Sequence, residues 1–162
     1  MQQNDSSQPT LKRILFCTDL SENADLAFTF ALDAALKRPG CELYLLHVIP
    51  EAESQFSKSY IYEVDGVDDK AKQDIDQRIQ QAYTSRLPDN LKMQIEYRVG
   101  KDSEEILSFA RKKDIDLIVI GRQGHSSIQK AFFGNVTEKV VRKADCAVIV
   151  VPLSYQKKQG KN

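Results

Sequence analysis

Residues 116–152 read DLIVIGRQGHSSIQKAFFGNVTEKVVRKADCAVIVVP and contain the pattern on which the architecture rests. A continuous apolar run at 117–120 is typical of a strand buried on both faces, and a second apolar run closes the stretch at 147–151. Between them lie a loop with three glycines and an amphipathic segment with helical spacing. Strand, glycine loop, helix and strand in succession indicate a parallel α/β sheet. Such sheets bind ligands where strands end in loops, so we expect half of any small-molecule site here.

The preceding part of the chain predicts three more strands, at 14–18, 42–48 and 93–99. The last of these alternates apolar and polar residues, as an edge or half-exposed strand does. Helices are expected at about 24–37, 68–86 and 102–113, and from near 134. Alanines at helical spacing on the first would let it lie close to the sheet, and Asp102 with Glu105 resembles a capping box at the start of the third. Each crossover is long enough for a right-handed βαβ unit. The predicted fold is therefore α/β: a doubly wound, Rossmann-like sheet of five parallel strands with helices on both faces.

The length of 162 residues suits one domain with a sizeable core. We expect that domain to span residues 11–153, after a disordered polar lead-in at 1–10 and before a polar tail at 154–162. Residues 51–67 show no clear period and carry scattered aromatic residues, so we expect a long surface excursion beside the site.

Composition excludes several classes of partner. Lys and Arg number 23 and Asp and Glu number 23, so we expect no binding to nucleic acid or to anionic membranes. No apolar run approaches the roughly 20 residues that span a bilayer, and the N-terminus lacks the form of a secretory signal. The three cysteines lack CxxC spacing and are expected as buried free thiols. These features favour a cytoplasmic protein.

Two loops are the candidate functional segments. Asp19 follows the strand at 14–18, and its carboxylate could accept a hydrogen bond from a base amino group or a ribose hydroxyl. Gly121 follows the strand at 117–120, and in a sheet ordered 3-2-1-4-5 these two strands are neighbours. Glycines let backbone N–H groups approach phosphate oxygens, and a helix that starts near Gly134 offers its positive end to them. We therefore expect Asp19 and Gly121 to face one crevice.

Each of these residues also has a plainer interpretation. The glycines could serve turn chemistry alone, and Asp19 could simply cap the first helix. His125 is more often an exposed loop histidine than a proton donor, since no partner base accompanies it. The chain has neither G-x-x-x-x-G-K-[ST] nor G-x-G-x-x-G, so the P-loop and dinucleotide interpretations have no motif behind them.

One pattern resembles a known family. The spacing G-x2-G-x9-G, from Gly121 through Gly124 to Gly134, is followed by NVTEKVVRKADCAVIVVP and resembles the universal stress protein family. The resemblance extends to ILFCTDLSENADLA near the start and to LLHVIP, and it covers about residues 11–153. It implies the strand order 3-2-1-4-5.

The resemblance to the ATP-binding branch of that family implies a ligand and a site. Asp19, in a TD-x-S turn, and Val48, in the LHV segment, would hold adenosine, and Ile120 would flank the nucleotide. The glycines and the residues after the third would hold ribose and phosphates. The candidate site comprises Thr18, Asp19, Val48, Ile120, Gly121, Arg122, Gly124, His125, Gly134, Asn135, Val136 and Thr137. The expected ligand is ATP, or ADP or AMP, with any Mg²⁺ carried by the phosphates and no metal ligand from the protein.

The chain departs from the family pattern at Asn135, where the family has Ser or Thr after the third glycine. An amide can still donate a hydrogen bond, and the N–H groups of Asn135, Val136 and Thr137 remain. We expect phosphate binding to be weakened or shifted more than lost.

The last strand is predicted to lie at a sheet edge. An exposed apolar edge is an aggregation liability unless it is covered. The resemblance implies a homodimer in which this strand pairs with its twofold mate through Ala147, Val148, Ile149, Val150 and Val151.

Three functions therefore stand as hypotheses. The first is a nucleotide-binding stress-response module that acts as a homodimer. The second is a nucleotide-free protein-interaction module of the same fold, which Asn135 and the polar surface favour. The third is a slow ATPase or phosphotransferase, which ranks last because neither a catalytic base nor a metal-binding carboxylate pair accompanies the glycine loop.

Overall fold

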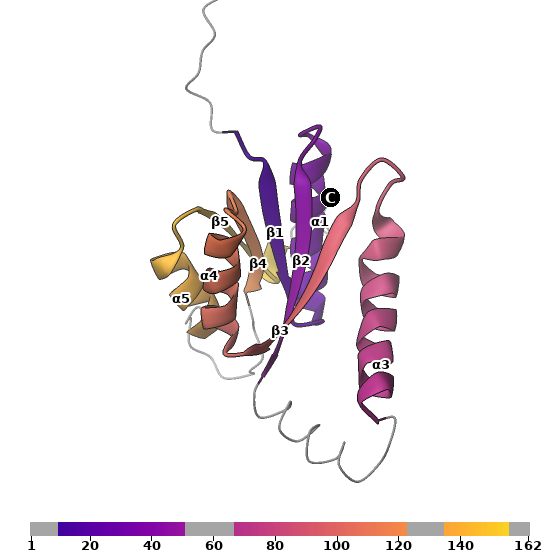
Figure 1. Cartoon of the computed structure of the whole chain (residues 1–162). Helices are drawn as coiled ribbons and strands as arrows, with labels where there is room; N and C mark the ends of the chain where they lie inside the picture. Colours follow the sequence, from indigo (N-terminus) through magenta and orange to yellow (C-terminus); the bar gives the residue numbers. More distant parts are fainter. Residues whose placement is uncertain (1–9, 51–66, 123–134, 156–162) are drawn as a thin grey trace, which may run out of the picture.

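The computed structural model describes residues 10–50, 67–122 and 135–155. Its five strands are β1 (Arg13–Thr18), β2 (Glu42–Pro50), β3 (Met93–Gly100), β4 (Leu117–Arg122) and β5 (Ala147–Pro152). All four pairings are parallel, and the strands are ordered β3-β2-β1-β4-β5 (Figure 1). The predicted sheet and its strand order are thus confirmed, with β3 and β5 at the two edges.

The described helices cover both faces of the sheet. One face packs against α1 (Glu22–Leu36) and α3 (Val67–Ala82), and the short 3₁₀ helix η1 (Thr84–Arg86) follows α3. The other packs against α4 (Asp102–Lys112) and α5 (Asn135–Lys143) (Figure 1). Two apolar clusters result, one on each side of β1, because alternate residues of a strand point to opposite faces.

The face beneath α1 is the more aromatic of the two cores. Phe16 of β1, Phe28 of α1 and Tyr83 form a triangle with ring centroids 5.0–5.1 Å apart, and all three are fully buried. Small side chains line the same helix face, as the sequence predicts: Ala24, Ala27, Ala31 and Ala35 are buried. These alanines let α1 lie close to the sheet.

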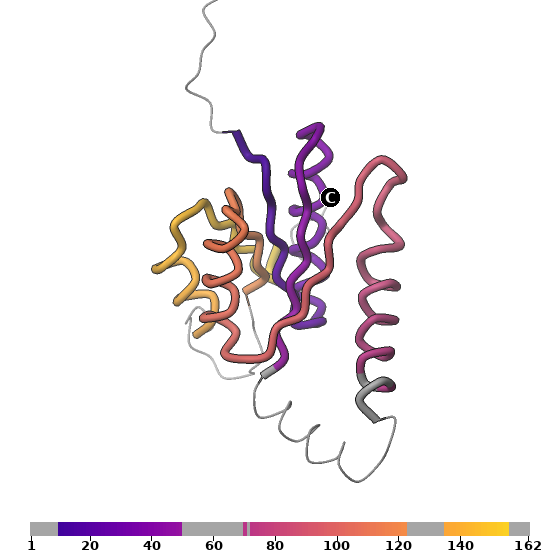
Figure 2. The backbone as a smooth tube through the Cα atoms, in the orientation of Figure 1, coloured from indigo at the N-terminus to yellow at the C-terminus, as the bar shows by residue number. Residues whose placement is uncertain are grey.

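Several element ends differ from prediction: the second strand continues to Pro50, and the first helix begins at Glu22. The fourth strand does not stop at Ile120 but continues through Gly121 to Arg122, since Gly121 is extended and pairs with Val151. The helix expected at 68–86 ends as α3 at Ala82, and η1 follows. The chain then turns into β3, at the upper right of Figure 2. Tyr83 lies between α3 and η1, turned inward with its side chain fully buried.

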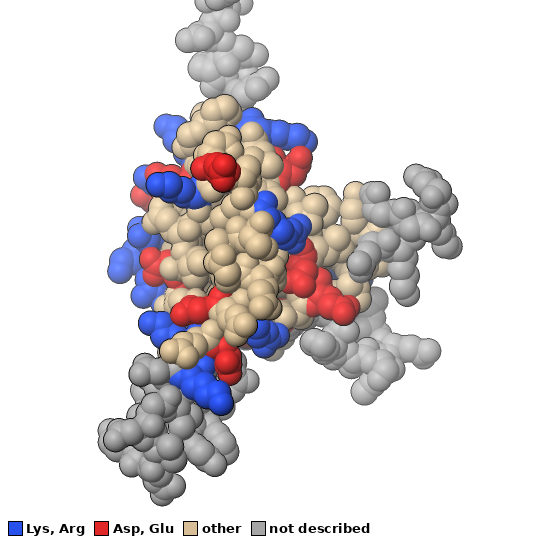
Figure 3. Space-filling model, turned by 90° about the vertical axis from the view of Figure 1, so that its right-hand side faces the viewer, with Lys and Arg blue, Asp and Glu red and all other residues tan. Residues whose placement is uncertain are grey.

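Several expectations fall outside the described residues. They concern the lead-in at 1–9, the excursion at 51–66, the loop at 123–134 and the tail at 156–162. On the face shown in Figure 3, acidic and basic side chains occur together, in keeping with the balanced charge. Among the described helices, none combines the length and the apolar character that crossing a membrane requires.

Candidate functional site

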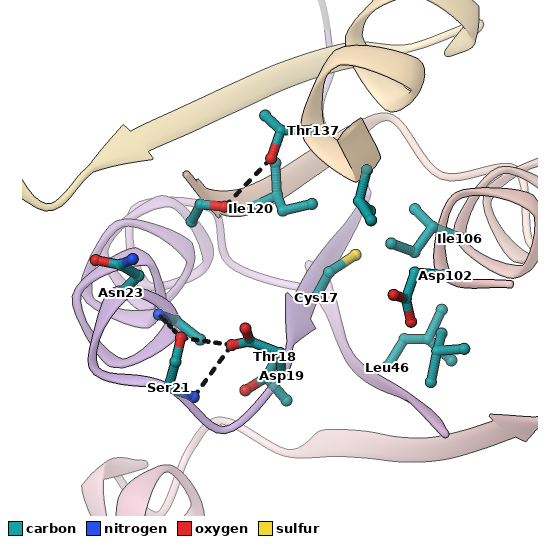
Figure 4. A pocket seen from close by; sticks show the side chains of 14 residues that line it. Cys17, Thr18, Asp19, Ser21, Asn23, Leu46, Asp102, Ile106, Ile120 and Thr137 are labelled. Carbon is teal, nitrogen blue, oxygen red and sulfur yellow. Dashed lines mark hydrogen bonds between the residues drawn. The ribbon is translucent and has the colours of Figure 1, made fainter. Parts of the chain in front are cut away.

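A pocket opens at the carboxyl ends of β1, β2 and β4 and is bounded by the first turns of α1, α4 and α5 (Figure 4). It brings together residues that are far apart in the sequence. Of the residues predicted to form the site, the pocket is lined by Thr18, Asp19, Val48, Ile120, Gly121, Val136 and Thr137. Asp19 and Gly121, which we expected to face one crevice, therefore line the same pocket.

The remaining predicted residues are not among those that line the pocket. Arg122 is exposed at the end of β4, and Asn135 is exposed as the first residue of α5. Gly124, His125 and Gly134 lie outside the described residues.

Asp19 is held within the turn that follows β1. Its Oδ1 accepts hydrogen bonds from the backbone N–H of Ser21, at 3.1 Å, and from the Ser21 hydroxyl (Figure 4). Ser21 is the N-cap of α1, and its Oγ accepts from the N–H of Ala24 at 3.4 Å. Asp19 is thus not the cap itself but the residue that orients the cap, and its exposed carboxylate lies at the pocket.

Thr18 lines the pocket, but its hydroxyl is engaged on the α3 side of the sheet. Thr18 Oγ1 lies 2.7 Å from the Tyr83 hydroxyl and accepts the N–H of Leu20 at 2.9 Å. Its carbonyl oxygen lies 2.9 Å from Nδ1 of His47, which requires the tautomer with a proton on Nδ1. The role of Thr18 is therefore to shape the turn that follows β1.

The floor of the pocket is apolar. Leu46 and Val48 from β2, Ile106 from α4 and Ile120 from β4 are buried and belong to the core beneath α4 and α5. Cys17 adds a thiol to this floor, and burial raises its pKa, so the group stays protonated at neutral pH. A flat, weakly polar ring system suits such a floor, because its burial removes apolar surface from water.

The opposite wall is formed by β4 and the start of α5. The Thr137 hydroxyl donates to the carbonyl oxygen of Gly121 at 3.5 Å, and this contact fixes the helix start against the strand end (Figure 4). The first N–H groups of an α-helix have no partner within the helix and carry partial positive charge. Val136 and Thr137 line the pocket, so this wall suits a phosphate or another anion.

Gly121 has a packing role that the sequence interpretation missed. A Cβ added at this position would stand 2.7 Å from the backbone oxygen of Asn23. The close approach of β4 to the first turn of α1 therefore requires glycine, whether or not a phosphate is bound.

Further lining residues escaped prediction: Cys17, Ser21, Asn23, Ala24, Leu46, Asp102 and Ile106. Leu46 could have been predicted, because it precedes Val48 by two residues and therefore lies on the same face of the strand.

Asp102 was predicted to cap the helix that follows β3. Instead, Lys101 is the N-cap, without a side-chain bond, and Asp102 lies in the first turn with its carboxylate at the pocket (Figure 4).

Comparison with known proteins agrees with this architecture. A sequence model of the family described as "Universal stress protein family" matches residues 10–152. Universal stress protein MJ0577 of Methanocaldococcus jannaschii is 29% identical over 154 residues, which cover 86% of this chain and 94% of the relative. The solved structure of MJ0577 superposes with a TM-score of 0.68 over 89% of this chain and 97% of that one, at 28% identity.

Two further solved structures are similar. Universal stress protein UspA from Lactobacillus plantarum has a TM-score of 0.68 and 28% identity, and the match covers 89% of this chain and 99% of that one. The universal stress protein from Archaeoglobus fulgidus, solved in complex with dAMP, shares the fold with a TM-score of 0.60 at 22% identity, over 88% and 99% of the two chains. Because the family match spans nearly the whole sequence, the chain belongs to the universal stress protein family.

Proposed function

We propose that this protein binds an adenine nucleotide, ATP or its relatives ADP and AMP, and that it acts as a nucleotide-responsive stress regulator. One observation carries the proposal: Asp19 at the end of β1 and the start of α5 line the same pocket, on either side of an apolar floor. The dAMP complex of the Archaeoglobus fulgidus protein supports the class of ligand, because that protein has this fold.

The described residues fit such a ligand. The floor formed by Leu46, Val48 and Ile106 suits a base, and the Asp19 carboxylate suits the hydrogen-bond donors of a base or ribose. The start of α5 at Val136 and Thr137 suits the phosphates, with Gly121 beside it. In this orientation the phosphates lie across the pocket from the Asp19 carboxylate, which reduces the repulsion between like charges (Figure 4).

Any Mg²⁺ in this proposal arrives with the phosphates. Among the described residues, the His, Cys, Asp and Glu side chains form no group of three or more that could hold a metal ion. Nucleotide-bound Mg²⁺ keeps several of its waters and needs few protein ligands.

The proposal includes a homodimer formed through β5, in the cytoplasm. β5 lies at one edge of the sheet, and Val148, Ile149 and Val150 are only half-buried there. Covering them with a second copy would remove apolar surface from water and pair the edge.

The proposed cytoplasmic location rests on the cysteines. Cys17, Cys41 and Cys146 are free thiols, of which only Cys17 is buried, and free thiols suit a reducing compartment.

Calorimetric titration with ATP, ADP and AMP tests the proposal. We expect saturable binding by the wild type and a loss of about tenfold or more in Asp19→Ala, equivalent to about 1.4 kcal/mol. Asp89→Ala, which removes an exposed carboxylate from the turn before β3, is the matched control and should bind as the wild type does.

A second variant, Gly124→Val, tests the glycine spacing and should also weaken binding. If the wild type bound none of the three nucleotides, the proposal would be wrong. The nucleotide-free interaction module would then be the better interpretation, with capture of a defined protein partner as its own requirement.

A further inference from the structure

The turn that carries Asp19 is held from the other side of the sheet. Leu20, the next residue, has φ 64°, in the left-handed region that costs an L-residue on the order of 1 kcal/mol. Its N–H is bonded to Thr18 Oγ1 at 2.9 Å. The conformation of the turn therefore depends on where the Thr18 hydroxyl is held.

Tyr83 fixes that hydroxyl. The Tyr83 hydroxyl donates to Oδ1 of Asp25 at 2.8 Å and lies 2.7 Å from Thr18 Oγ1. Because Tyr83 has one proton and gives it to a carboxylate, Thr18 must donate to the Tyr83 oxygen. The result is a directed chain from the N–H of Leu20 through Thr18 and Tyr83 to Asp25.

These linked hydrogen bonds have little freedom to rearrange. Thr18 is 6% exposed and Tyr83 is 0% exposed, so a hydroxyl that lost its partner could not turn to water. The Tyr83 ring is packed against Phe16 and Phe28, with centroids 5.1 and 5.0 Å away. The position of the hydroxyl is therefore set by the aromatic core.

The end of α3 supplies a second contact to the same turn. Arg78 donates from one of its guanidinium nitrogens to the carbonyl oxygen of Leu20 at 3.3 Å. Both backbone polar groups of Leu20 thus have partners that are fixed directly or indirectly by residues 78–83.

We propose that Tyr83 and Arg78 are positioning residues of the pocket, which hold the Asp19 turn and thereby couple α3 to ligand binding. The coupling to a nucleotide rests on the proposed function, but the positioning of the turn does not. Because energetic coupling between two sites is reciprocal, ligand binding at Asp19 in turn protects the end of α3.

Hydrogen exchange without nucleotide tests the positioning. Tyr83→Phe keeps the ring and removes only the hydroxyl, and we expect the amides of Leu20 and Ser21 to exchange at least about tenfold faster. Tyr97→Phe is the matched control, because it removes a hydroxyl that joins Asp76 of α3 to β3 and does not touch the turn. Unchanged exchange at Leu20 in folded Tyr83→Phe would overturn the proposal.

A double-mutant cycle with AMP tests the coupling. We expect Tyr83→Phe to raise the Kd for AMP about tenfold in the wild-type background and less than about twofold in Asp19→Asn, because Tyr83 acts through Asp19. Tyr97→Phe should change neither value. An equal tenfold loss in both backgrounds would show a general structural effect and would refute the coupling.

Arg78→Ala serves if Tyr83→Phe does not fold, because Arg78 is exposed. It should accelerate exchange at Leu20 and raise the Kd for AMP in the same direction by a few-fold, whereas Lys72→Ala on the same helix should do neither. If the wild type bound no nucleotide, the proposed function would fall, and the exchange measurement would still decide whether α3 positions the turn.

Discussion

The backbone of Gly121 lies against the carbonyl of Asn23, with no room for a side chain between them: a Cβ at 121 would stand 2.7 Å from the Asn23 oxygen. This contact brings the end of β4 to the first turn of α1. It accounts for a glycine at this position by packing alone, before any ligand is considered.

We therefore expect Gly121→Ala to destabilise the protein in the absence of nucleotide. Forcing a methyl group against fixed backbone should lower the free energy of unfolding by roughly 1–3 kcal/mol. Urea denaturation measures the change. Gly40→Ala is the comparison for a cost that does not come from packing. Nothing lies within 4 Å of its Cβ position, and only its φ of +82° is strained for alanine. A fully stable Gly121→Ala would contradict the packing argument.

Ser21→Ala should weaken the first helix. The substitution removes the N-cap oxygen that accepts the N–H of Ala24 and the hydroxyl that Asp19 holds. Loss of a cap typically costs about 1 kcal/mol. Thermal or urea unfolding reports the cost, and Ser108→Ala, an exposed serine inside α4, is the control. Equal stability of the two variants would show that Ser21 does not act as a cap.

The sequence predicts the sheet well because its strands differ strongly from their surroundings. The apolar runs at 14–18 and 117–120 are bounded by polar or glycine residues, and such runs leave few alternatives to buried parallel strands. The family resemblance added the strand order. The crevice between Asp19 and Gly121 followed from that order, because neighbouring parallel strands end at the same edge.

The contacts that shape the site could not be predicted in this way. Tyr83 is 65 residues from Thr18 in the sequence, and nothing in the pattern around Tyr83 indicates that its hydroxyl contacts the end of β1. The left-handed conformation of Leu20 was equally hidden, because leucine rarely adopts it. Asp102 looked like a cap because aspartate favours helix starts in general.

Asn135→Ser should restore the family pattern at the start of α5. A hydroxyl in place of the amide is expected to lower the Kd for ATP by roughly threefold while that for AMP changes less, because the family resemblance implies that a hydroxyl at this position contacts the phosphates. Calorimetry with both nucleotides measures the ratio. Asn90→Ser, in the exposed turn before β3, is the control. An equal change for ATP and AMP would indicate that position 135 does not distinguish the phosphates.

Stability should fall at alkaline pH. Burial raises the pKa of Tyr83 and of Tyr97, so the folded state keeps protons that the unfolded state releases above about pH 10. Where the folded state binds more protons, the free energy of unfolding decreases as pH rises. Tyr83→Phe removes one such group and should flatten the decrease between pH 10 and 12. Urea denaturation across this range tests it, and parallel curves for the two proteins would contradict it.

Val148→Lys should disrupt the proposed dimer. The residue is half-buried on the edge strand, and two lysines facing one another across a twofold axis would repel. Sedimentation analysis should show a shift from dimer to monomer. Val141→Lys, which adds the same charge at a residue of α5 that is 48% exposed, should leave the dimer intact. A dimer that persists in Val148→Lys would place the interface elsewhere.

The positions of the three thiols determine which of them an oxidant reaches first. Cys41 and Cys146 precede β2 and β5, at the amino ends of the strands, whereas Cys17 lies at the carboxyl end of β1 on the pocket floor. Peroxide attacks thiolates, and although burial raises the pKa of all three thiols, Cys17 is buried whereas Cys41 and Cys146 are only half-buried. Oxidation should therefore begin at Cys41 and Cys146, at the opposite end of the sheet from the pocket, and leave the pocket floor unmodified.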